Sequence, residues 1–283
     1  MLSLNRNRSV GEQRGDKRSG DGLLFFPDGR RYEGTFTEDN ITGFGKMTYS
    51  DGQSCYEGYW LNGARSGIGL YHDANVEYSG EWLHDKRHGQ GEQRYADGYY
   101  RGAWKNDVHN GHGLRVWHNG TKYCGVWEKG QHYGNGVLIR RQESYNGMWK
   151  NGCRHGKGRH LWKKASYTGN WNKDVPEGTG KYIFEDGSEY EGNFVAGLPH
   201  GKGICKRNDS ICYGEFKKGI FTLGSRKWPH GTEYAGVWEN DYIGRGLIKT
   251  KFCVEFSGSW HYDCGMKIWL VEPRAVVQGH ENI

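Results

Sequence analysis

The chain of 283 residues contains 47 glycines, only 5 prolines, and 14% aromatic side chains. About one residue in six is glycine, against roughly 7% in ordinary proteins, yet the scarcity of proline excludes collagen, and the many Trp and Tyr side chains exclude a disordered chain. The net charge of +6 is mild for this length and does not indicate nucleic acid as a partner.

The chain divides into three segments. Residues 1–19 carry several Arg and Lys and no apolar stretch, so we expect a flexible, weakly basic segment without a secretory signal. Residues 20–265 hold a repeated pattern. Residues 266–283 form a tail, which is either a capping strand or a docking peptide. No apolar run reaches the roughly 20 residues of a membrane helix. Seven cysteines without a disulfide-framework spacing predict a reduced, cytoplasmic protein.

The repeated pattern is an aromatic residue, any residue, Gly, any residue and a second aromatic residue. It occurs eleven times, at spacings of 22 to 24 residues, and a G-x-G follows nine residues after each of the first eight central glycines. The later copies are less regular, at Cys212, Leu223 and Gly244. The first residue and the central glycine of the first eight copies are Tyr32 and Gly34, Tyr56 and Gly58, Tyr78 and Gly80, Tyr100 and Gly102, Tyr123 and Gly125, Tyr145 and Gly147, Tyr167 and Gly169, and Tyr190 and Gly192.

This spacing predicts strands. Residues two apart share one face of a strand, so each copy places two rings on one face, with a glycine between them that leaves room for a ring from a neighbouring strand. Turn pairs such as Asp51-Gly52 before the unit and Asn62-Gly63 after it favour two-residue hairpins. We therefore predict an all-β fold, an elongated, twisted, single-layer antiparallel β-meander of about eleven two-strand repeats. At about 10 Å per repeat, its length is on the order of 100 Å.

The phased Y-x-G-x-W and G-x-G units resemble the MORN repeat (membrane occupation and recognition nexus) over residues 20–265. The resemblance implies an elongated or grooved single-layer sheet. Arrays without an attached enzyme domain resemble radial-spoke-head and other ciliary or cytoskeletal members of this family. The resemblance thus implies a cilium, flagellar axoneme or other cytoskeletal location.

The sequence offers no reactive centre. His88, His155 and His200 occupy equivalent repeat positions, roughly 20–30 Å apart, and cannot converge on one zinc ion. Each G-x-G is expected to open a strand rather than a helix, so it does not form a phosphate loop. We expect no enzymatic activity, no cofactor and no metal. Cys205 and Cys212 face each other if residues 208–209 form a hairpin turn, as two thiols or as a disulfide.

A sheet with a row of rings predicts a non-catalytic scaffold that binds other proteins along its aromatic ribbon. The candidate partner-binding residues are Trp60, Trp82, Trp104, Trp127, Trp149 and Trp171; the alternative is that these rings only pack the interior of the sheet. The unpaired strands at the two ends of the sheet could pair with those of a second copy, which would give a homodimer through terminal repeats. The alternative function is a membrane-surface adaptor for anionic phospholipids such as phosphoinositides, although the basic residues are mixed with acids.

Overall fold

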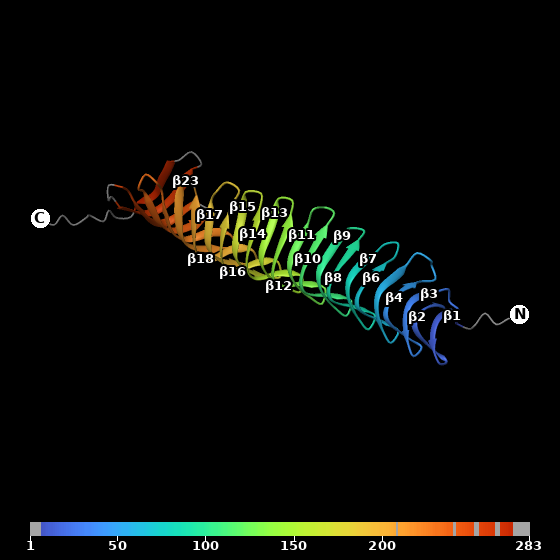
Figure 1. The fold of residues 1–283 in the computed structure, drawn as a ribbon. Helices are drawn as coiled ribbons and strands as arrows, with labels where there is room; N and C mark the ends of the chain where they lie inside the picture. Colours follow the sequence, from blue (N-terminus) through green and yellow to red (C-terminus); the bar gives the residue numbers. More distant parts are fainter. Residues whose placement is uncertain (1–6, 208, 240–241, 252–254, 264–266, 274–283) are drawn as a thin grey trace. The chain divides into compact units, whose positions relative to one another are not determined.

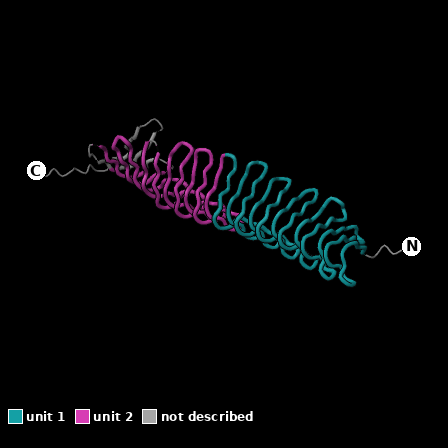
Figure 2. Tube along the Cα trace, viewed as in Figure 1, with its two compact units in different colours: residues 1–141 teal, residues 142–283 magenta. Residues whose placement is uncertain are grey.

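The computed structural model describes residues 7–207, 209–239, 242–251, 255–263 and 267–273. They fall into two compact units, residues 1–141 and residues 142–283, drawn in different colours in Figure 2. The described residues form strands and turns and contain no helix, so no described helix could cross a membrane.

Each unit is an antiparallel meander in which every strand pairs with the next strand along the chain (Figure 1). The described strands of unit 1 are β1 (Arg8–Arg14), β2 (Lys17–Phe25), β3 (Arg31–Thr37), β4 (Asn40–Thr48), β5 (Cys55–Leu61), β6 (Ala64–His72), β7 (Glu77–Leu83), β8 (Lys86–Tyr95), β9 (Gly98–Lys105), β10 (Val108–Trp117), β11 (Lys122–Glu128) and β12 (Gln131–Arg140).

Unit 2 repeats this arrangement, also with consecutive antiparallel pairing. Its described strands are β13 (Glu143–Lys150), β14 (Cys153–Trp162), β15 (Ala165–Asn172), β16 (Val175–Ile183), β17 (Glu189–Val195), β18 (Leu198–Arg207), β19 (Ser210–Lys217), β20 (Ile220–Lys227), β21 (Glu233–Glu239), β22 (Tyr242–Lys249), β23 (Glu255–Asp263) and β24 (Lys267–Pro273). The prediction of an all-β antiparallel meander of two-strand repeats is confirmed in both units.

The segments at the two ends also contain strands. β1 lies inside the segment 1–19 that the sequence suggested was flexible, and it pairs with β2, so the meander begins before residue 20. β24 lies inside the predicted tail and pairs with β23. Residues 1–6 and 274–283 lie outside the described residues.

The hairpins after the aromatic units have two residues, as predicted. Asn62 and Gly63 both have positive φ angles, 51° and 79°, and Asn151 and Gly152 repeat this geometry. The turns before the units differ from the prediction at Asp51-Gly52, where six residues separate β4 from β5. There the Asp51 carboxylate accepts a hydrogen bond of 2.8 Å from the Ser54 amide, which holds a longer loop closed.

The G-x-G pairs lie inside strands, which corrects the expectation that they open them. In β8, Gly89 has a φ of 58° and lies at a bulge, where the register with β7 shifts between Gly80 and Glu81. Gly91, the second glycine, pairs directly with Gly80. The two glycines have different roles: the first gives the bulge its positive φ, and the second allows close packing under a ring.

Candidate functional site

The aromatic face, which carries the Tyr and Trp of the repeats, is packed against itself. Tyr100 makes edge-to-face contacts with Trp104 of its own repeat and Trp127 of the next, at centroid distances of 5.2 and 5.5 Å. The same pairing links Tyr56 to Trp60 and Trp82. Each ring therefore packs between two others, in the geometry that aromatic quadrupoles favour.

The six tryptophans proposed to bind partners lie in this packing. Trp60, Trp82, Trp104, Trp127, Trp149 and Trp171 are 3 to 6% exposed. The Trp82 indole N–H donates to the Gly69 carbonyl at 3.2 Å, and the Trp104 N–H donates to the Gly91 carbonyl at 3.3 Å. These side chains have their hydrogen-bond and ring partners within the sheet and expose little of their surface to solvent.

The repeat tyrosines are more deeply buried still. Tyr32, Tyr56, Tyr78, Tyr100, Tyr123, Tyr145, Tyr167 and Tyr190 are at most 2% exposed. The Tyr100 hydroxyl donates to the Ala103 carbonyl at 2.9 Å, and burial raises its pKa above the ordinary value. A Cβ on Gly113 would lie 2.3 Å from that hydroxyl. The ring nearest the central glycine Gly102 is Tyr100 of its own strand, and not a ring from a neighbouring strand as the sequence predicted. The same ring also covers Gly113, which pairs with Gly102 on the neighbouring strand.

In four repeats an arginine binds the aspartate of a hairpin turn about 20 residues later, an arrangement that we call the arginine clasp. Sequence reasoning missed it. Arg87 donates from its backbone N–H and its Nε to the Asp107 carboxylate, both at 3.0 Å, and its guanidinium lies 4.5 Å from the Trp104 ring centroid. The members are Arg18–Asp39, Arg65–Asp85, Arg87–Asp107 and Arg154–Asp174. The Arg18 side chain holds the pKa of the Asp39 carboxyl below its usual range. The sequence pattern that could have revealed the clasp is an Asp at the second position of a two-residue turn, about 20 residues after an Arg.

At the described turns whose repeat has another residue at the arginine position, the second turn residue is glycine. His109 occupies the arginine position before the Lys129-Gly130 turn, and Gly130 donates its N–H to the His109 carbonyl. The His109 ring stacks on Tyr100 at 3.6 Å. Burial, together with the nearby Arg87 and Arg115, lowers the pKa of His109 to about 4, so this imidazole is neutral at physiological pH.

The less regular repeat around Cys212 is compensated by another ring. Cys212 replaces the repeat tyrosine, and Phe221 at the arginine position is 4% exposed and packs 5.1 Å from Phe216. Cys205 and Cys212 pair directly across β18 and β19, which confirms the predicted register. Both are buried and carry thiols rather than a disulfide.

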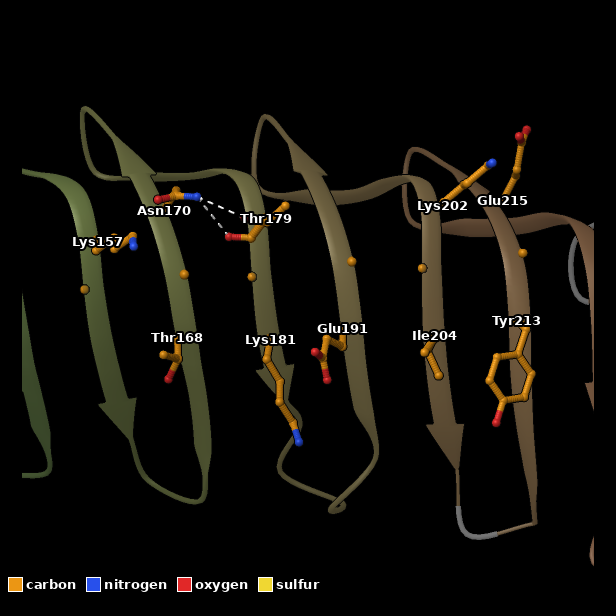
Figure 3. Close-up of a pocket in the computed structure, with 16 residues that line it drawn as sticks. Lys157, Thr168, Asn170, Thr179, Lys181, Glu191, Lys202, Ile204, Tyr213 and Glu215 are labelled. Atoms are coloured by element: carbon orange, nitrogen blue, oxygen red, sulfur yellow. Dashed lines mark hydrogen bonds between the residues drawn. The ribbon is translucent and has the colours of Figure 1, made fainter.

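The opposite surface of each sheet, which we call the outer face, carries a groove whose floor is glycine backbone. In unit 2 this groove has a volume of about 1010 Å3 and is floored by Gly158, Gly169, Gly180, Gly192, Gly203 and Gly214. Figure 3 shows one row of side chains on each side of these glycines: Lys157, Asn170, Thr179, Lys202 and Glu215 in one, and Thr168, Lys181, Glu191, Ile204 and Tyr213 in the other. A similar groove in unit 1 is floored by Gly22, Gly34 and Gly45.

Large apolar side chains are exposed along this face. In unit 1, Phe44, Tyr59 and Ile68 are 52 to 59% exposed, and the Phe44 and Tyr59 rings lie 5.6 Å apart. In unit 2, Tyr213 and Leu223 are about half exposed. Sequence reasoning ranked the rings of the repeat above the residues between them. The alternation of a strand nevertheless places those intervening residues on the outer face.

The side chains that flank the glycine row differ in charge between the units. Over the described residues of unit 1 they include six carboxylates and two cations: Glu12, Asp21, Glu33, Glu57, Glu81 and Glu92, with Lys46 and Arg101. In unit 2 they include five cations and two carboxylates: Lys157, Arg159, Lys181, Lys202 and Arg245, with Glu191 and Glu215. The net charges of these rows are therefore −4 and +3.

Within the described part of the chain, no group of three His, Cys, Asp or Glu side chains could hold a metal ion. His88, His155 and His200 lie at equivalent positions in β8, β14 and β18. The arrangement offers surfaces for binding.

No curated protein matches the chain in sequence. Similar solved structures include a mutant of the TCP10 domain of Danio rerio CPAP, with 11% identity, 84% of this chain and 92% of that chain covered, and a TM-score of 0.21. They also include the SAS-4 (dCPAP) TCP domain of Drosophila melanogaster in complex with a proline-rich motif of Ana2, with 10% identity, coverages of 88% and 86%, and a TM-score of 0.17. At these TM-scores neither likeness carries an argument.

The family comparison is decisive. The MORN repeat matches residues 32–54, 56–75, 78–98, 100–122, 145–164, 167–189 and 190–210, which together make up more than half of the chain. These matches begin at the repeat tyrosines, whose rings cover the glycine pairs of the sheet. The chain belongs to the MORN repeat family.

Proposed function

We propose that this chain is a non-catalytic protein-interaction scaffold whose partners dock on the outer face. The observation that carries the proposal is the difference between the two faces. The aromatic face has its rings and indole N–H groups paired within the sheet, whereas the outer face exposes Phe44, Tyr59 and Ile68 beside a groove of glycine backbone. Exposed apolar groups bordered by charges are typical of protein-binding surfaces.

In this proposal the six repeat tryptophans stabilise the sheet and do not contact partners directly. Because their exposure is 3 to 6%, a partner could touch little of their surface. Their contribution to binding is to hold the strands, and hence the outer-face side chains, in fixed positions. A ciliary, axonemal or other cytoskeletal assembly is the proposed setting, supported only by the resemblance of such arrays to ciliary members of the family.

Proximity labelling in ciliated cells tests the scaffold. We compare the native chain with the outer-face variant Phe44→Ser/Ile68→Ser and with the control Glu38→Ser, whose side chain is 75% exposed in a hairpin. The expected result is a set of axonemal proteins that the native chain and the control label and the outer-face variant does not. Equal labelling by all three folded proteins would contradict the outer-face assignment.

Anionic phospholipid is a second candidate ligand, favoured by the net charge of +3 on the outer-face rows of unit 2. Clustered Lys and Arg attract anionic membranes over about a Debye length. Sedimentation with phosphoinositide vesicles at physiological salt tests this, with Lys157→Glu/Lys202→Glu as the comparison. Absence of pelleting by the native chain would remove the lipid candidate.

A homodimer through terminal repeats has one supporting observation. All seven residues of β1 are exposed, and among the described strands β1 pairs only with β2, along one edge, so its other edge could accept a strand of a second copy. Ser9→Pro, which removes a backbone N–H from the edge of β1 that faces away from β2, should weaken such a dimer, as measured by sedimentation velocity.

A further inference from the structure

We propose that copies of this chain associate through their outer faces, the acidic face of unit 1 in one copy meeting the basic face of unit 2 in another. This inference does not depend on the scaffold function, because a monomeric chain could still bind other proteins.

The basic side chains of unit 2 are available for such a contact. Lys157, Arg159 and Lys202 are exposed, and none forms an ion pair among the described residues. Lys181 is the exception, since it contacts the Glu189 carboxylate at 2.9 Å. Lys157 shares its row with neutral Asn170 and Thr179, whereas Lys202 lies opposite Glu215 across β18 and β19. The rows of unit 2 still keep their net charge of +3, which a carboxylate-rich surface would complement.

The acidic side chains of unit 1 form the matching surface. Asp21, Glu33 and Glu57 border one groove, and the two glutamate side chains are 66% and 46% exposed. Glu33 contacts Arg31 at 2.9 Å, and Glu57 contacts Lys46 at 3.7 Å. Exposed ion pairs of this kind are weak and exchange partners readily. The six carboxylates therefore leave an excess of negative charge after both cations are counted.

Apolar groups lie among the charges on both surfaces. Phe44, Tyr59 and Ile68 do so in unit 1, and Tyr213 and Leu223 in unit 2. Apolar burial would supply the attraction, and the opposite charges would select unit 1 against unit 2 and disfavour like faces meeting. A second copy is the one partner whose charge pattern the sequence itself specifies.

Sedimentation velocity of the full chain at low and high salt tests the inference. At about 0.05 M NaCl we expect concentration-dependent association, weakened about tenfold or more at 0.5 M, where the Debye length is only a few ångströms. A species that stays monomeric at low salt would overturn the proposal. So would association that does not change with salt, which is the behaviour of a dimer held by backbone pairing at β1.

Charge reversal gives the sharper test. Glu33→Lys/Glu57→Lys changes the net charge of the unit 1 rows from −4 to 0, and Lys157→Glu/Lys202→Glu changes that of the unit 2 rows from +3 to −1, so neither variant keeps two faces of opposite charge. Each variant alone should be monomeric, and an equimolar mixture of the two should associate again. The control Glu38→Lys, at a hairpin with a side chain that is 75% exposed, should associate like the native chain. Circular dichroism establishes that each variant is folded, and a mixture that stays monomeric overturns the proposal.

Discussion

Replacing Trp104 by alanine tests whether the aromatic face is a packed core. Trp104 is 3% exposed and contacts Tyr78 and Tyr100 edge to face, at 5.4 and 5.2 Å. A tryptophan buries roughly 150–250 Å2, and at about 25 cal/mol per Å2 this gives an upper bound of about 4–6 kcal/mol. Aromatic truncations in cores typically cost about 3–5 kcal/mol, and we expect a loss in that range.

Urea denaturation followed by circular dichroism measures the free energy of unfolding, with Ile68→Ala as the control. Ile68 is 59% exposed on the outer face, so its truncation should change stability by less than about 1 kcal/mol. Because each repeat contacts mainly its neighbours, hydrogen exchange should accelerate chiefly in β7 to β10 of the Trp104→Ala variant. A folded variant that loses less than about 1 kcal/mol would refute the packing argument.

Four further changes test the other contacts. Gly113→Ala places a Cβ 2.3 Å from the Tyr100 hydroxyl and should lower the free energy of unfolding, measured by urea denaturation, by about 1–3 kcal/mol. A variant as stable as the native chain would contradict this contact. Tyr100→Phe removes the 2.9 Å bond to the Ala103 carbonyl, and should cost about 1 kcal/mol by the same measurement. Asp107→Gly removes the clasp carboxylate, but glycine readily adopts the φ of 68° at this position, whereas valine does not. Asp107→Gly should therefore be less destabilising than Asp107→Val by roughly 1–2 kcal/mol, and a lower melting temperature for Asp107→Gly would count against this. The unfolded chain protonates His109 near pH 6.5 and the folded chain only near pH 4, so stability should fall as pH drops through that window, and His109→Phe should lessen the fall in urea midpoints between pH 7 and pH 5.

The sequence predicted the repeating part of the fold because its signals are local. The spacing of Tyr, Gly and Trp two residues apart dictates which side chains share a face, and Asn62-Gly63 dictates a two-residue hairpin. Because the turns between strands are short, each strand then pairs with the next strand along the chain. These features depend on neighbours in the chain and need no knowledge of distant contacts.

Contacts between repeats were harder to predict. The sequence does not reveal that the Tyr100 ring covers glycines on two strands, or that Asp107 closes a turn for Arg87, because these depend on the bulge and on residues about 20 positions apart. The expectation that each G-x-G opens a strand was wrong for the same reason: a bulge with positive φ keeps a strand continuous through the first glycine.

The amino-acid sequence by itself thus determined the repeat, its strands and its membership of an all-β class, since all three follow from periodicity. Only the tertiary structure decided on which face the side chains find their partners within the sheet and on which face they are exposed. Ring packing between neighbouring repeats buries the six tryptophans, whereas the residues between the repeat aromatics line the outer grooves and carry charges of opposite sign in the two units. Burial depends on what lies across the strand, and a pattern along one strand cannot specify it.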